Sequence, residues 1–310
     1  MSRRAREARW TPSELPDLSG RTAVVTGANS GVGLATSVEL ARHGAHVVLA
    51  CRDPHRGDEA LGQVRVEVPG ASVELRRLDL ADLSSVRDFS DRVLAEVERI
   101  DVLVNNAGVM APPKRRETAD GHELQLGTNH LGHFALTGRL LPLLHEARVV
   151  TLSSNAHRAG RIDLDDLEST ASYHPWRAYG QSKLANLLFT MQLQRVADRA
   201  GLDLVSVAAH PGFAATGLVR NGPGARSARI GRVMDAVTRL VAQSAEAGAW
   251  PVLYAAAQPG VRGAEFFGPS GPGGWWGTPV RTTAAQVAYD PDLAAALWQR
   301  SEELTGVRYP

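Results

Sequence analysis

The stretch TAVVTGANSGVG, residues 22–33, decides the predicted fold. Its first five residues form a short apolar run that is typical of a buried strand. A glycine-rich turn follows and leads into an apolar helical pattern over 31–43. A strand, a tight glycine turn and a helix in this order can present backbone N–H groups to a phosphate. The stretch therefore predicts an α/β fold with a nucleotide site at its first turn.

The same alternation continues along the chain. Apolar strands that alternate with helices predict a single-domain, Rossmann-type doubly wound parallel sheet with helices on both faces. One helix should pack through Val86, Phe89, Val93, Leu94 and Val97, which share a face. The predicted strands are 22–26, 46–50, 73–80, 101–108, 147–155 and 202–212, and the predicted helices are 31–43, 55–67, 84–100, 121–146 and one around Tyr179.

Segments outside this rhythm define the expected domain organisation. We expect residues 1–19 to form an N-terminal extension, 20–267 the dinucleotide-binding catalytic domain, and 268–310 a C-terminal extension. A Gly- and Arg-rich substrate loop is expected at about 213–230. The turn-rich segment 268–281 is either a second substrate contact or a plain surface loop. The arginine-rich start is best interpreted as a solvated tail.

Composition excludes several classes of protein. The 310 residues carry a formal net charge of +1, so no global field attracts nucleic acid or an anionic membrane. A single cysteine, Cys51, excludes an internal disulfide and fits a reducing compartment. No run of about 20 apolar residues occurs, and the start has no signal-peptide pattern. We therefore expect a soluble, cytoplasmic protein without an integral membrane segment.

The predicted cofactor contacts begin at the glycine turn and continue at the end of the second strand. Asn29 and Ser30 offer side-chain partners within the turn. Arg52 follows the second strand and can pair with a 2′-phosphate, which predicts a preference for NADP(H). Asp53 is the alternative, since it could serve as the acid of an NAD(H) site. Asp79, at the end of the third strand, could accept from the adenine amino group or cap the following helix.

The sequence AYGQSK, residues 178–183, places a tyrosine one helical turn before a lysine. Residues four apart share a helix face, so the Lys183 ammonium can lie beside the Tyr179 phenol and lower its pKa. Ser153 and Ser154 end the fifth predicted strand at the carboxyl edge of the sheet. A serine hydroxyl there can hold a substrate oxygen or cap a turn.

Taken in order, these motifs closely resemble the short-chain dehydrogenase/reductase superfamily over about residues 20–267. LACRD, TNHLGHF and SSNAH look like its retinol-dehydrogenase-like branch, which includes bacterial oxidoreductases. The motifs that carry the resemblance are TGANSGVG at 26–33, NNAG at 105–108, Asn129, the serine pair, Tyr179-x-x-x-Lys183 and HPG at 210–212.

The resemblance implies an NADP(H)-dependent oxidoreductase that transfers a hydride between nicotinamide and a carbonyl or alcohol substrate. Tyr179 would be the general acid/base, and Lys183 would lower its pKa and bind the nicotinamide ribose. The family's serine matches Ser154, and Asn129 would position a water that links Lys183 to solvent. No metal is implied. The predicted cofactor-binding residues are Gly27, Asn29, Ser30, Gly31, Val32, Gly33, Arg52, Asp79, Leu80, Asn106, Ala107, Gly108, Tyr179, Lys183, Pro211, Gly212 and Thr216.

The expected partner is a small apolar carbonyl or alcohol substrate, with no nucleic acid. The resemblance also implies a homodimer or homotetramer formed through the helices that carry Asn129 and Tyr179. Many members of the branch carry a membrane anchor that is not evident here. The wide spacing between the serine and the tyrosine predicts an insertion over 155–178 near the cleft mouth. The alternative function is a catalytically silent dinucleotide-sensing or scaffold protein of the same fold.

The remaining polar residues are interpreted as structural. His130 and His133 lie in a predicted helix and suit packing or solvent exposure better than a metal pair, because no further ligands are evident nearby. His210 precedes the expected nicotinamide-covering residues and is interpreted as structural. The acidic run 163–168 is expected to be a solvated loop.

Overall fold

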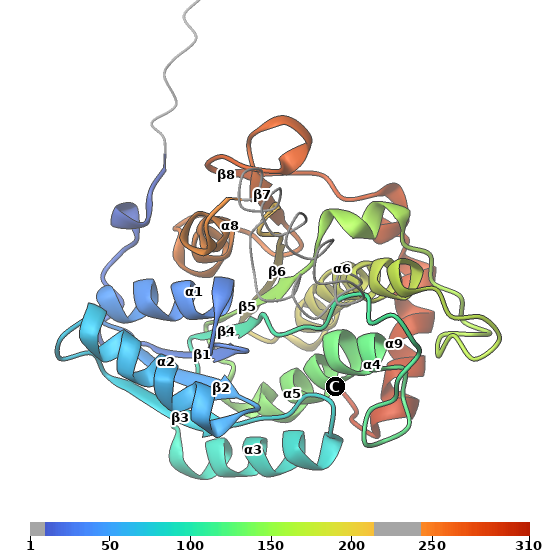
Figure 1. The fold of residues 1–310 in the computed structure, drawn as a ribbon, viewed down its shortest axis with the longest axis horizontal. Helices are drawn as coiled ribbons and strands as arrows, with labels where there is room; N and C mark the ends of the chain where they lie inside the picture. The colour runs from blue at the N-terminus through green and yellow to red at the C-terminus, as the bar shows by residue number, and fades with distance from the viewer. Residues whose placement is uncertain (1–9, 214–242) are drawn as a thin grey trace, which may run out of the picture.

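The computed structural model describes residues 10–213 and 243–310. Its centre is a sheet in the order β3-β2-β1-β4-β5-β6-β7-β8 (Figure 1). Strands β1 to β7 run parallel, and β8 pairs antiparallel with β7. The strands are β1 (Thr22–Thr26), β2 (His46–Cys51), β3 (Val73–Arg77), β4 (Val102–Asn105), β5 (Ala147–Leu152), β6 (Leu204–Ala209), β7 (Phe266–Pro269) and β8 (Pro279–Arg281).

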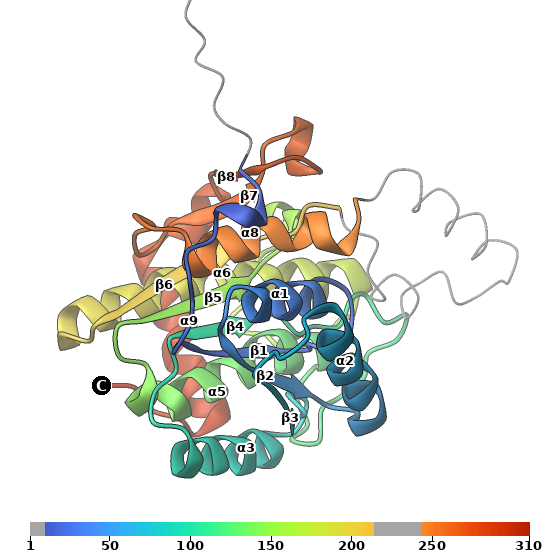
Figure 2. The same ribbon diagram turned by 90° about the vertical axis from the view of Figure 1, so that its left-hand side faces the viewer.

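Helices cover both faces of the sheet, as the side view shows (Figure 2). One face is covered by α1 (Gly31–Arg42), α2 (Pro54–Glu67) and α8 (Ala245–Ala257), and the other by α3 (Leu83–Glu96), α5 (Gly132–Leu140) and α6 (Pro175–Ala200). Outside α5 and α6 lies α9 (Pro291–Thr305). The short elements are η1 (Pro12–Glu14), α4 (Leu124–Leu126), η2 (Gly127–Leu131), η3 (Leu141–Leu143), η4 (Asn155–Ala159), η7 (Pro272–Gly274) and η8 (Gln286–Tyr289). The predicted doubly wound Rossmann-type fold is confirmed.

Local sequence signals explain where several helices begin. The Asp53 carboxylate accepts hydrogen bonds from the first backbone N–H groups of α2, and Asp82 does the same for α3. Asp290 caps α9 in the same way. Pro54 and Pro291 occupy the first helical positions, where the missing N–H has no intrahelical partner to lose. The capping of α3 by Asp82 shows that the alternative capping role considered for Asp79 was wrong.

Some predicted elements are longer than the real ones. The third predicted strand ends at Arg77, because Asp79 turns the chain by accepting the Ala81 N–H at 3.0 Å. In the helix α3, Leu94 was expected on the packed face but is 37% exposed. Val86, Phe89 and Val93 make the buried face of this helix. A segment expected to be turn-rich, 268–281, contributes the end of β7 and the antiparallel β8.

The predicted helix over 121–146 is broken into several pieces, with a π-helical turn, η2, at its centre. Within this π-turn the Asn129 side chain bonds to the backbone of Val109. At Gly132 the chain approaches the loop after β3 so closely that a Cβ would lie 2.4 Å from the Leu80 carbonyl oxygen. The π-turn thus lies where the helix meets the carboxyl ends of the strands, a common place for functional residues.

The C-terminal residues belong to the same packed body as the sheet. Trp298 of α9 packs edge-on against Phe134 of α5 and stacks on Phe189 of α6, with ring centroids 4.9 and 5.7 Å apart. Tyr309 donates a hydrogen bond to the Phe134 carbonyl at 2.8 Å. The C-terminal segment of the chain therefore covers part of α5 and α6.

Two predicted segments lie outside the described residues: the N-terminal residues 1–9, and 214–242, which include most of the expected substrate loop. In the ranges that are described, no helix combines the length and apolarity needed to cross a bilayer. The acidic run 163–168 was expected to be fully solvated. Glu168 departs from this expectation, because it accepts hydrogen bonds from the His122 ring and the Glu123 N–H.

Candidate active site

The glycine turn between β1 and α1 is packed too tightly for larger residues. Gly27 and Gly31 have φ values of +63° and +57°, in the left-handed region that favours glycine. A Cβ on Gly33 would lie 2.4 Å from Asn106 Nδ2 and 2.6 Å from the Gly27 carbonyl oxygen. Ser30 precedes α1 without a side-chain cap, which leaves N–H groups of the first helical turn free for an anion.

Thr26 fastens this turn to the NNAG segment after β4. Its hydroxyl oxygen lies 2.9 Å from the backbone N–H groups of both Asn106 and Ala107. The Asn106 amide in turn donates to the Thr26 carbonyl at 2.7 Å. These contacts divert the chain from the β4 ladder, which explains why the strand ends at Asn105 rather than at Gly108. The two predicted cofactor segments are therefore adjacent.

The two residues considered for cofactor choice differ in what they contact. The Asp53 carboxylate accepts the N–H groups of His55 and Arg56 as the cap of α2. Arg52 is exposed, and no ion pair is formed by its guanidinium with the residues that the structure describes. The Arg52 cation is thus available at the carboxyl end of β2, while the Asp53 carboxylate caps α2 through Oδ1.

Ser153 and Ser154 have different partners, although they are neighbours. The buried Ser153 hydroxyl donates to the Lys183 carbonyl of α6 at 2.8 Å. Ser154 is less buried, and its hydroxyl oxygen accepts the Ala156 N–H at 3.3 Å. Burial raises the pKa of Tyr179, and the Ser154 side chain opposes that rise. Ser153 therefore holds the helix in place, whereas Ser154 shares the open side of the site with the tyrosine.

Tyr179 and Lys183 lie on one face of α6, as their spacing predicted. The Lys183 ammonium lies over the Tyr179 ring, 5.8 Å from its centroid. It donates to the Leu152 carbonyl at 3.2 Å, and burial lowers the pKa of Lys183 to about 8. Burial raises the pKa of Tyr179, which is opposite to the lowering expected from the lysine. The ammonium contacts the ring face and a carbonyl instead of the phenol oxygen.

The Asn129 side chain connects the segment after NNAG with helix α6. Its side-chain oxygen accepts the Val109 N–H at 2.7 Å, and its amide donates to the Val109 carbonyl and to Ser182 Oγ. The Ser182 hydroxyl donates to the Tyr179 carbonyl at 2.9 Å. A Cβ on Gly108 would lie 3.0 Å from Asn129 Oδ1 and 3.5 Å from Lys183 Nζ, so these groups converge on that glycine.

The helix α6 approaches the loop after β5 through two glycines. A Cβ on Gly160 would lie 2.3 Å from the Gly180 carbonyl oxygen, so no side chain fits between them. His157, whose role the sequence reasoning missed, bonds to the Ser154 carbonyl through Nδ1 at 2.6 Å. Its Nε2 accepts the Ala285 N–H at 3.1 Å. The SSNAH motif contained this histidine, but nothing in it identifies a partner 128 residues away.

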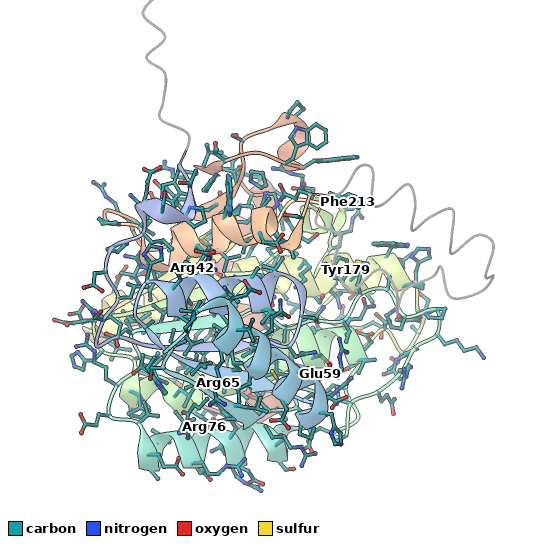
Figure 3. The ribbon with its side chains drawn as sticks, turned by 60° about the vertical axis from the view of Figure 1, so that its left-hand side comes forward. Arg42, Glu59, Arg65, Arg76, Tyr179 and Phe213 are labelled. Carbon is teal, nitrogen blue, oxygen red and sulfur yellow. The ribbon has the colours of Figure 1, made fainter. Side chains whose placement is uncertain are left out.

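The segment after β6 is held by the loop between β7 and β8. The Trp275 carbonyl accepts the Phe213 N–H at 3.0 Å. Gly212 has φ +67°, and a Cβ there would lie 2.4 Å from the same carbonyl oxygen. Phe213 and Tyr179 lie toward the same end of the molecule (Figure 3). Pro211 and Gly212 directly precede Phe213, whereas Thr216 lies outside the described residues.

His130, His133 and His210 are buried and hydrogen-bonded, which fits packing, one of the two roles expected for His130 and His133. Burial lowers the pKa of His130 and of His210 to about 4. His130 Nε2 bonds to Ser301 of α9, and His210 Nδ1 accepts the Gly212 N–H. Among residues 10–213 and 243–310, no three His, Cys, Asp or Glu side chains gather as they would around a metal ion.

The sheet, the glycine turn and the Ser154–Tyr179–Lys183 cluster can be compared with known proteins. Residues 21–224 match the family model described as short chain dehydrogenase. The chain belongs to the short-chain dehydrogenase family. It is similar to human retinol dehydrogenase 13, with 40% identity over 300 residues that cover 94% of this chain and 87% of that protein. Mouse polyprenol dehydrogenase is also 40% identical, over 308 residues that cover 96% and 87%.

Solved structures of short-chain dehydrogenases have the same fold. A crystal structure of an uncharacterized protein from Mycobacterium paratuberculosis has a TM-score of 0.82 at 46% identity and covers 98% of this chain and 100% of that one. A short-chain dehydrogenase from Shigella flexneri, complexed with NADP, has a TM-score of 0.61 at 21% identity, over 82% and 98%. The latter likeness shows the fold alone. This chain is an oxidoreductase of the retinol-dehydrogenase-like branch of the family.

Proposed function

We propose that this short-chain dehydrogenase uses NADP(H) to interconvert an apolar alcohol and its carbonyl compound, with Tyr179 as the general acid/base. The observation that carries the proposal is the cluster of Ser154, Tyr179 and Lys183 at the carboxyl edge of the sheet. The cluster lies beside the NNAG segment, which Thr26 fastens to the glycine turn. A proton donor and a nucleotide-binding turn therefore share one site.

The residues present fit a dinucleotide. The glycine turn admits a pyrophosphate beside the N-terminus of α1, where N–H groups of the first turn are free. Lys183 is a buried cation with a single backbone partner, so two of its three donors remain for ribose hydroxyls. Asn29, Asn106 and Ala107 would line the adenosine and ribose side. When bound, the nicotinamide supplies or accepts the hydride.

The proposed preference for NADP(H) over NAD(H) rests on the different environments of Arg52 and Asp53. An NAD(H) site needs a carboxylate that can accept from the ribose 2′-OH. Asp53 accepts two N–H groups of α2 through Oδ1, which holds its carboxylate at the start of that helix, whereas the Arg52 guanidinium is exposed at the end of β2. A guanidinium there favours a 2′-phosphate through charge-assisted hydrogen bonds. Asp79 keeps one carboxylate oxygen for an adenine amino group.

The chain's own residues account for the proton transfer. In the reductive direction, Ser154 holds the substrate oxygen and the Tyr179 O–H gives it a proton. In the oxidative direction, the phenolate takes the proton back. The positive charge of Lys183, on the face of the ring, favours the phenolate form more than a neutral residue would. Asn129 would position a water that exchanges protons between Lys183 and solvent.

An apolar substrate is favoured by the aromatic residues around the site. Trp176 packs edge-on to Tyr179 with 6.1 Å between ring centroids, and it is 50% exposed. Phe213 packs against Trp275, which in turn contacts Trp276. The names of two relatives refer to retinol and polyprenol, which are both long apolar alcohols. We therefore propose a retinol-like alcohol or aldehyde as the substrate class.

The test measures NADPH and NADH binding by fluorescence, and NADPH consumption with all-trans-retinal as the probe. We expect tighter binding of NADPH than of NADH, and retinal-dependent oxidation of NADPH. Equal affinity for both cofactors would contradict the role of Arg52. Binding of NADPH without turnover of retinal or of a panel of apolar aldehydes and ketones would favour the alternative, a dinucleotide-sensing protein.

A further inference from the structure

His133 lies in α5, buried between the glycine turn and the π-turn η2. Its side chain is 1% exposed. Nδ1 lies 3.0 Å from the Asn129 carbonyl oxygen, and Nε2 lies 2.9 Å from the Thr26 hydroxyl. The ring thus contacts both sides of the site without reaching the space where substrate or cofactor would bind.

The hydrogen-bond partners fix the tautomer of this ring. A carbonyl oxygen can only accept, so the nitrogen that faces Asn129, Nδ1, must carry the proton. Burial lowers the pKa of His133 to about 3, and the nearby Lys183 charge acts in the same direction, so the ring is neutral. Nε2 therefore has a free lone pair, and the Thr26 hydroxyl donates to it.

The Thr26 hydroxyl is then fully used. It donates to His133 Nε2 at 2.9 Å, with the Val104 carbonyl as a more distant acceptor at 3.3 Å, and it accepts from the N–H groups of Asn106 and Ala107, both at 2.9 Å. The result is a directed chain of hydrogen bonds that runs from the NNAG segment through Thr26 and His133 to the Asn129 carbonyl. Such chains polarise one another, and an unpaired member would be costly in a buried position.

We propose that His133 is a positioning residue. Through its two ring nitrogens it would fix the position of the Thr26 hydroxyl, and so of the cofactor turn, relative to the Asn129 carbonyl. The proposal rests on the proposed function, in which Asn129 positions a water beside Lys183. The Asn129 side chain is committed to Val109 and Ser182, so its carbonyl is the group left to orient that water. The bond from His133 to this carbonyl, 3.0 Å long, would fix the direction in which it points.

The two nitrogens can be tested separately. His133→Asn places an amide N–H near the position of Nδ1, so it keeps the donor to Asn129 and loses the acceptor for Thr26. His133→Gln places an amide oxygen near the position of Nε2, so it keeps the acceptor and loses the donor. The measurements are the Kd for NADPH by fluorescence and kcat with all-trans-retinal at saturating NADPH.

We expect His133→Asn to raise the Kd for NADPH about tenfold with kcat within about threefold of the wild type, because a buried hydrogen bond contributes on this scale. We expect His133→Gln to lower kcat about tenfold with little change in Kd. The matched control is His130→Gln, which removes a buried histidine of the preceding turn that bonds to Ser301. This control should lose stability without changing Kd or kcat of the folded protein.

Equal effects of the two His133 variants, or wild-type constants in both, would overturn the proposal and leave His133 as a packing residue. The tautomer gives a test that needs no cofactor. In the ¹⁵N NMR spectrum of histidine-labelled protein, His133 should show a protonated Nδ1 and an unprotonated Nε2 throughout pH 5–8. The opposite tautomer would contradict the proposal even if the enzyme turns over retinal. Failure of the wild type to bind either cofactor, with the expected tautomer present, would contradict the proposed function instead.

Discussion

The two sides of the candidate active site are built in different ways. The proposed cofactor side depends on a continuous stretch, 26–33, whose turn needs glycine because of positive φ values and close backbone packing. The catalytic side depends on side chains that distant segments hold in place, such as Asn129 by Val109 and Ser182. Binding and chemistry should therefore be separable by mutation, and each prediction below tests this separation.

The largest effect is expected for Tyr179→Phe. Removal of the phenol hydroxyl takes away the proposed proton donor, and general acid/base groups contribute up to about 10⁴-fold to a rate. We expect kcat with retinal to fall about a thousandfold, while the Kd for NADPH stays within about threefold. Because the ring packs against Trp176 without using its hydroxyl, the fold should be kept. A parallel loss of NADPH binding would show that the two sides are not separable.

The second prediction concerns the cofactor side, through Gly33→Ala. The new Cβ would overlap the Asn106 amide and the Gly27 carbonyl. Overpacking of this kind costs about 2–3 kcal/mol, which corresponds to a loss of about a hundredfold in NADPH affinity if the turn must shift. Gly62→Ala on α2, where a Cβ meets nothing within 4 Å, is the matched control and should bind normally. If kcat at saturating NADPH also fell a hundredfold, binding and chemistry would not be separable by mutation.

A smaller effect is expected for Arg52→Ala, measured by fluorescence titration. Loss of an exposed charge-assisted contact should weaken NADPH binding about tenfold and leave NADH binding unchanged. Arg65→Ala serves as the control, because Arg65 lies in the last turn of α2, away from the carboxyl end of β2 (Figure 3). An equal loss for both cofactors would assign Arg52 a structural role and return Asp53 to consideration.

The smallest effect is expected for Ser153→Ala. This change removes a buried hydrogen bond to the Lys183 carbonyl, which contributes about 1 kcal/mol to the free energy of unfolding. We expect a decrease of about 2 °C in Tm, by thermal unfolding, with kcat within about threefold of the wild type. Ser154→Ala should show the reverse pattern, with an intact Tm and a lower kcat. If Ser153→Ala instead lowered kcat with an intact Tm, and Ser154→Ala lowered Tm alone, the roles assigned to the two serines would have to be exchanged.

The sequence predicted the parts of the molecule that local patterns determine. Apolar runs located the strands, and the glycine turn located the nucleotide side of the sheet. The π-turn was not predicted, nor was the bond that Asn129 makes there to Val109, 20 residues earlier. The role of His133 depends on Thr26, 107 residues away, and a histidine in an apolar helix does not identify its partner. The antiparallel β8 was missed because it follows the turn-rich stretch 268–278 and is only three residues long.

The Tyr179–Lys183 pair was predicted correctly as neighbours on one helix face, but the direction of the tyrosine pKa was not. Spacing alone states that two side chains can meet, whereas the pKa depends on which atoms meet and on burial. The ammonium lies over the ring and donates to Leu152, so burial dominates and raises the pKa of Tyr179. The position of the Lys183 ammonium relative to the phenol oxygen is set by the packing of the folded chain, so the spacing of the two residues in the sequence could not predict it.

The packing of α9 over α5 and α6 has a consequence for how the enzyme responds to dilution. A site whose supporting helices are braced by a second subunit loses activity when the subunits separate. Here Trp298 and Tyr309 of the same chain brace the helices that carry Asn129 and Tyr179, so the bracing has no concentration dependence. We expect the specific activity to stay constant from micromolar to nanomolar enzyme.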